Sequence, residues 1–83
     1  QNLLRYPALS PDGSQIAFVY QGDIWVENLQ DQIPLRITIN EAYDAFPVWS
    51  PDGKQIAFTS SRYGSGDVFV VNADGSNLKR LTF

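Results

Sequence analysis

The sequence SPDGSQIAF at residues 10–18 returns almost unchanged as SPDGKQIAF at residues 50–58. The similarity continues on the C-terminal side, where GDIWV at residues 22–26 matches GDVFV at residues 66–70. An internal repeat of this length is the signature of an array of similar structural units. The chain therefore contains two copies of one unit of about forty residues.

The repeat extends almost to the end of the chain, because Arg36-Ile37-Thr38 corresponds to Arg80-Leu81-Thr82. The spacing between equivalent residues increases within the second copy. This increase places a short insertion at residues 61–65, whose sequence is SRYGS.

Each copy is expected to form four short strands, because runs rich in Val, Ile and aromatic residues alternate with turn residues. The expected strands are 6–9, 15–20, 23–28 and 35–39 in the first copy, and 46–49, 55–60, 67–72 and 78–83 in the second. No segment of ten or more residues has helical periodicity. We predict an all-β chain of two four-stranded antiparallel β-propeller blades, residues 1–40 and 41–83, within one structural domain.

The tetrapeptide Ser-Pro-Asp-Gly predicts a tight turn between the first two strands of each copy. Proline presets φ at the second position of a type I turn, aspartate tolerates the third, and glycine takes the left-handed conformation that follows. The residues assigned to this structural role are Pro11, Asp12, Gly13, Pro51, Asp52 and Gly53.

Composition excludes several kinds of site. The 83 residues include no cysteine and no histidine, which removes disulfides, Ser-His catalysis and the commonest metal ligands. The formal net charge of −3 disfavours nucleic-acid binding, and no apolar run is long enough for a membrane span. We therefore expect no cofactor, no nucleic-acid partner and no membrane insertion.

Carboxylates and lysines are the remaining candidates for catalysis. Asp12 and Asp52 could form an acid–base pair, but their place in identical turns favours a structural role. A serine nucleophile would need Lys54 or Lys79 as its base, and we expect both to be solvated surface residues. The sequence thus indicates no catalytic residue.

Asp23 and Asp67 open the third strand of each copy and could bind a cation. Each copy supplies only one such acid, so we expect a buried hydrogen bond or an ion pair with Arg36 or Arg80 instead. The aromatic residues that recur at equivalent positions are expected to pack between blades. They are Phe18, Trp25, Trp49, Phe58 and Phe69.

Loops carry function more often than cores do, and the inserted segment interrupts the repeat. Arg62 and Tyr63 lie in this insertion, while Tyr43 and Asp44 lie in the link between the copies. These four residues form a possible contact loop, although plain length variation in a surface connection is the favoured explanation of the insertion.

The quoted motifs resemble the repeat of TolB-type propellers. The longer strings at residues 4–13, 42–53, 61–64 and 67–70 resemble the first two blades of secreted tricorn-like serine peptidases. In that family the propellers precede the catalytic region and guide peptides, and nothing here matches the family's catalytic serine and histidine. The resemblance implies a non-catalytic scaffold that binds protein or peptide, and a periplasmic or extracellular location.

Two blades leave two outer faces uncovered, and repeat arrays generally need about three units or more. The chain is therefore expected to be a partial propeller completed by missing sequence, or to self-associate into a ring. Three chains would supply six blades and four would supply eight, both within the usual range. In the second case the molecule would be a stand-alone TolB-like interaction scaffold.

Overall fold

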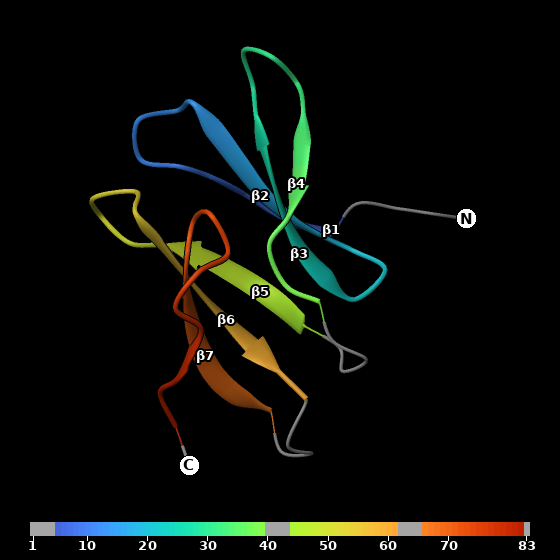
Figure 1. The fold of residues 1–83 in the computed structure, drawn as a ribbon, viewed down its shortest axis with the longest axis vertical. Coiled ribbons are helices and arrows are strands. Elements are labelled where there is room, and N and C mark those ends of the chain that lie inside the picture. The colour runs from blue at the N-terminus through green and yellow to red at the C-terminus, as the bar shows by residue number, and fades with distance from the viewer. Residues whose placement is uncertain (1–4, 40–43, 62–65, 83) are drawn as a thin grey trace.

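The structure is a computed structural model that describes residues 5–39, 44–61 and 66–82. These residues contain eight β-strands. The first sheet contains β1 (Arg5–Leu9), β2 (Gln15–Tyr20), β3 (Asp23–Asn28) and β4 (Pro34–Arg36), and the second contains β5 (Asp44–Trp49), β6 (Gln55–Ser60), β7 (Asp67–Asn72) and β8 (Lys79–Arg80). Both sheets are antiparallel with their strands in sequence order, and they lie side by side (Figure 1). The predicted all-β class with two four-stranded blades is confirmed. The predicted boundary between residues 40 and 41 lies outside the described residues.

The turns between β1 and β2 and between β5 and β6 have the geometry that Ser-Pro-Asp-Gly predicts. The N–H of Gly13 donates to the carbonyl of Ser10 at 2.9 Å, and the N–H of Gly53 donates to Ser50 over the same distance. Gly13 has φ of 75° and Gly53 has φ of 72°, both in the left-handed region that favours glycine.

Strands β1 and β5 contain a bulge that the sequence analysis did not foresee. Their pairing with β2 and β6 shifts register at Tyr6-Pro7 and at Phe46-Pro47. Tyr6 and Phe46 have φ of 53° and 58°, which bulky residues rarely adopt. Proline has no N–H to donate, but at a bulge of an edge strand the ladder does not need that donor. The proline also discourages pairing with a further strand.

The fourth strand of each sheet is shorter than predicted. The predicted ranges 35–39 and 78–83 were too long, since β4 is Pro34–Arg36 and β8 is Lys79–Arg80. After β4, the N–H groups of Ile37 and Thr38 both donate to the carbonyl of Ile24, at 2.8 and 3.3 Å. The regular ladder ends there because two donors share one acceptor.

The core lies between the two sheets. It is built from small and β-branched residues of the first sheet and from aromatic and β-branched residues of the second. Its buried members are Ala17, Val19, Ile24, Val26, Ile37, Ile56, Phe58, Phe69 and Val71. The rings of Phe58 and Phe69 stack with centroids 5.9 Å apart, and Trp49 packs against the cluster. Phe58, Phe69 and Trp49 therefore pack between blades as expected, whereas Phe18 and Trp25 lie on the opposite face of the first sheet.

Candidate functional site

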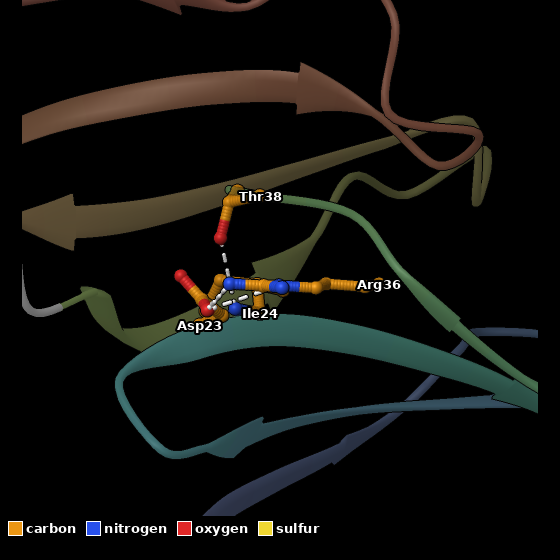
Figure 2. A network of polar contacts seen from close by, with 4 residues as sticks. All are labelled: Asp23, Ile24, Arg36 and Thr38. Atoms are coloured by element: carbon orange, nitrogen blue, oxygen red, sulfur yellow. Dashed lines mark hydrogen bonds and ion pairs between the residues drawn. The ribbon is translucent and has the colours of Figure 1, made fainter. Parts of the chain in front are cut away.

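Asp23 is the centre of a polar network at the start of β3. Its buried carboxylate accepts hydrogen bonds from Nε and Nη2 of Arg36, at 3.1 and 2.5 Å. The adjacent N–H of Ile24 donates to the buried hydroxyl of Thr38 at 2.9 Å, as Figure 2 shows. The motif Arg-Ile-Thr thus ties the last segment of the blade to the start of its third strand.

The second sheet contains the same network. Nη2 of Arg80 donates to Asp67 at 2.8 Å, and the N–H of Val68 donates to the hydroxyl of Thr82 at 2.9 Å. The hydroxyl of Thr82 also donates to the Asp67 carboxylate at 3.1 Å. Both expected ion pairs are therefore present, and their repetition points to a structural role in each blade rather than to a cation site.

Asp12 and Asp52 are exposed in separate turns and bind their own turn residues. Asp12 Oδ1 accepts from the hydroxyl of Ser14 at 2.7 Å and from that of Ser10 at 2.8 Å. The hydroxyl and the N–H of Ser14 hold the pKa of the Asp12 carboxyl below its ordinary value. The hydroxyl of Ser50 does the same for the pKa of Asp52. A carboxylate so stabilised stays ionised at neutral pH and does not act as a general acid.

The possible contact loop lies mostly outside the described residues, which include neither Tyr43, Arg62 nor Tyr63. Asp44 is described and is fully buried at the start of β5. Its N–H donates to the carbonyl of Gly22 at 2.8 Å, which joins the second sheet to a hairpin of the first. A contact role for this loop stays a prediction.

An aromatic pair at the neighbouring edges of the two sheets is the feature that sequence reasoning missed. The rings of Tyr6 and Phe46 lie 4.4 Å apart between centroids, on strands β1 and β5. Phe46 is 56% exposed and Tyr6 is 36% exposed. The recurrence of an aromatic residue before proline at equivalent repeat positions was the available signal. We call these two residues the edge aromatics.

The described residues contain no cluster of three or more metal-ligating side chains, and two of their shallow hollows are lined by residues of both sheets. One hollow of about 290 Å³ lies beside Leu35 and Ala73, and one of about 210 Å³ lies between Ile37 and Leu78. Both follow the groove between the sheets. Lys54 and Lys79 are exposed. Within the described segments, no helix is long and apolar enough to cross a membrane.

The comparisons with known proteins agree with this geometry. Residues 1–83 match the model of a family described as the tricorn protease N-terminal beta propeller domain. A protein assigned as TolB from Agrobacterium tumefaciens is 30% identical with a TM-score of 0.85, over 100% of this chain and 31% of that one. TolB from Acinetobacter baumannii is 29% identical with a TM-score of 0.83, over 98% and 21%.

The crystal structure of the tricorn protease is also similar, with 28% identity and a TM-score of 0.87 over 99% of this chain and 8% of that one. The chain thus spans less than a third of the length of each solved structure that it matches here.

Proposed function

The chain belongs to the family of tricorn protease N-terminal β-propeller domains, and we propose from this that it is a non-catalytic propeller segment that binds or guides peptides. Its working partner is a protein or peptide chain, as in a peptidase whose propeller precedes its catalytic region. Its location is periplasmic or extracellular, by similarity to TolB and to secreted tricorn-like peptidases.

One observation carries this proposal: the aspartates at equivalent positions of the two sheets are engaged in the same structural contacts. Asp23 and Asp67 are buried in ion pairs, and Asp12 and Asp52 are bound by their own turns. A catalytic site is built once, whereas these contacts are built once per blade. The repeated structural contacts of these aspartates therefore support a scaffold role for the chain.

The edge aromatics are the best candidates for contact with a peptide. Tyr6 and Phe46 are exposed although they are large, and each has an unfavourable φ that costs about 1–3 kcal/mol. Strained exposed residues cluster at ligand clamps and similar functional positions. Two adjacent rings offer apolar faces to the side chains of an extended peptide.

Binding is tested by fluorescence anisotropy with dye-labelled unstructured peptides of mixed apolar and polar composition. Asparagine tolerates a positive φ, so Phe46→Asn removes the ring and keeps the backbone. We expect the Kd to rise about twofold to tenfold, the value of one aromatic contact. Ile33→Asn, a change at a 67% exposed apolar residue beside β4, at the edge of the first sheet opposite β1, is the matched control.

The same samples are analysed by mass spectrometry for peptide cleavage. Binding without cleavage is the expected result. Cleavage by the purified chain would contradict a non-catalytic role, and equal Kd values for Phe46→Asn and the wild type would exclude the edge aromatics as the contact.

A further inference from the structure

Three Asp-Gly pairs lie at the tips of hairpins: Asp12-Gly13 between β1 and β2, Asp52-Gly53 between β5 and β6, and Asp74-Gly75 between β7 and β8. All three aspartates are exposed to water. Asp-Gly is the pair at which aspartate rearranges most readily to isoaspartate, because glycine has no side chain to obstruct the reaction. The turns of this chain therefore contain three candidate positions for a spontaneous modification.

The rearrangement needs only the atoms of the pair and water. The main-chain nitrogen of the glycine attacks Cγ of the aspartate, a C–N bond forms, and the carboxyl OH leaves as water with the proton of that N–H. Water then opens the resulting succinimide at either carbonyl, which returns aspartate or gives isoaspartate. Isoaspartate adds one methylene to the main chain, so the original turn cannot form again.

In the folded chain the attacking nitrogen is already engaged. Each glycine N–H donates to the main-chain carbonyl three residues earlier, at 2.9 Å for Gly13, 2.9 Å for Gly53 and 2.8 Å for Gly75. The proton that the reaction must remove is thus held in a hydrogen bond. The nitrogen can attack only after this bond is broken, which means that the turn has to open.

The carboxyl that would be attacked is engaged as well. Oδ1 of each aspartate accepts from the N–H two residues later, at 3.0 Å for Asp12 and Asp52 and at 2.9 Å for Asp74. Serine hydroxyls of the same turns, together with these N–H groups, lower the pKa of all three carboxyls. The protonated carboxyl is the form that loses water, so a carboxylate held by these donors resists the attack.

The residue after the glycine distinguishes the three turns. Ser14 and Ser76 donate their hydroxyls to Asp12 and Asp74, at 2.7 and 2.6 Å. Lys54 stands at the equivalent position of the remaining turn, where it offers Asp52 its N–H but no hydroxyl. A substitution at this one position therefore changes the number of donors to the carboxyl and leaves the glycine contact in place.

We propose that Asp12, Asp52 and Asp74 are positions of spontaneous isomerisation, that each reacts only when its own turn opens, and that a hydroxyl donated by the residue after the glycine slows the reaction. Every contact in this argument lies within one turn, so it does not depend on what covers the sheets. It is also independent of the binding of peptides.

The first measurement compares the folded chain with the same chain in concentrated urea. Both samples are kept at neutral pH in water enriched in heavy oxygen, which labels each succinimide that opens. Peptide mapping by mass spectrometry then gives one rate for each Asp-Gly pair. We expect all three rates to be about tenfold or more lower in the folded chain, because several hydrogen bonds must break before the attack.

Two substitutions test the role of the hydroxyl, with each rate divided by that of the same variant in urea. Ser14→Ala removes one donor and is expected to raise the rate at Asp12 about twofold to tenfold. Lys54→Ser supplies the missing donor and is expected to lower the rate at Asp52 by a similar factor. In each variant the two unaltered turns are the matched controls, and their rates should not change.

Three results would overturn the proposal. Equal rates in the folded and the urea-unfolded chain would show that the turns give no protection. An acceleration at all three pairs in Ser14→Ala would assign the reaction to unfolding of the whole chain instead of to the opening of one turn. Unchanged rates at Asp12 in Ser14→Ala and at Asp52 in Lys54→Ser would exclude the hydroxyl as the protecting group.

Discussion

At the scale of single residues, Thr38 shows how a side chain ends a strand. Its buried hydroxyl accepts from the N–H of Ile24, a donor that a regular fourth strand would pair with a backbone carbonyl. Thr38→Val keeps the shape of the side chain and removes this acceptor. We expect it to lower the free energy of unfolding by about 1–3 kcal/mol, the cost of a buried unpaired N–H. Urea denaturation measures the change.

The second blade supplies the matched control. Thr82 accepts from the N–H of Val68 in the same way, but this contact is exposed to water. Thr82→Val also removes the hydrogen bond that the Thr82 hydroxyl donates to Asp67, yet it should cost less than Thr38→Val, because water replaces the lost acceptor of the Val68 N–H. A loss at Thr82 as large as that at Thr38 would contradict this ranking.

At the scale of the element, the Ser-Pro-Asp-Gly hairpins make stability depend on pH. The pKa of Asp12 and that of Asp52 are lowered in the folded chain by hydroxyl and N–H donors of their own turns. Below about pH 4 the unfolded chain binds more protons than the folded one. The stability that these two carboxylates contribute is therefore fully present above about pH 4. It declines as the pH falls through the pKa values that Asp12 and Asp52 have in the folded chain.

Asparagine at both positions tests this dependence, because it keeps the turn and cannot titrate in this range. In thermal unfolding, the double variant Asp12→Asn/Asp52→Asn is expected to lose less stability than the wild type between about pH 5 and pH 2. This range spans the ordinary pKa values of carboxyl groups. If the double variant loses as much stability as the wild type over this pH range, other carboxyl groups are the cause of the loss.

The elements also show what the repeat could and could not predict. Strands 15–20, 23–28, 55–60 and 67–72 were predicted with the observed bounds, because turn residues delimit them on both sides. The last strand of the first copy was predicted too long, since the alternation of side chains continues through Ile37 after the ladder has ended at Arg36. The bulges at Tyr6 and Phe46 were missed because a positive φ at an aromatic residue opposes its intrinsic preference.

At the scale of the whole molecule, the ion pairs of Asp23 and Asp67 followed from the repeat, but the direction of packing did not. The sequence makes both faces of each sheet largely apolar. Only the structure shows that Phe58 and Phe69 face the first sheet while Phe18 and Trp25, at equivalent positions, face away from the second. The contact loop at Arg62 and Tyr63 was proposed from an interruption of the repeat, and its role stays a prediction.

The buried interface should make the two sheets unfold as one unit. Nε1 of Trp49 donates to the carbonyl of Ala8 at 2.7 Å, and Phe58 lies in the shared core with 1% of its surface exposed. Each sheet has one tryptophan, so Trp25→Phe and Trp49→Phe each leave a reporter in one sheet alone. In the background of either variant, Phe58→Ala is expected to cost about 3–5 kcal/mol, as truncation of a buried phenylalanine does.

Small domains have only about 5–15 kcal/mol of stability in total, so the tryptophan of either sheet should report this loss. Fluorescence-detected urea unfolding at concentrations too low for assembly is expected to give one midpoint for the two reporters, before and after Phe58→Ala. Phe18→Ala, the equivalent change in the first sheet, truncates a side chain that is also buried but lies outside the cluster shared by the two sheets, so it should leave the contact between the sheets intact. Separate midpoints for Trp25 and Trp49 would mean that each blade is stable by itself, and the packing of Phe58 between the sheets would then add little to the stability of the fold.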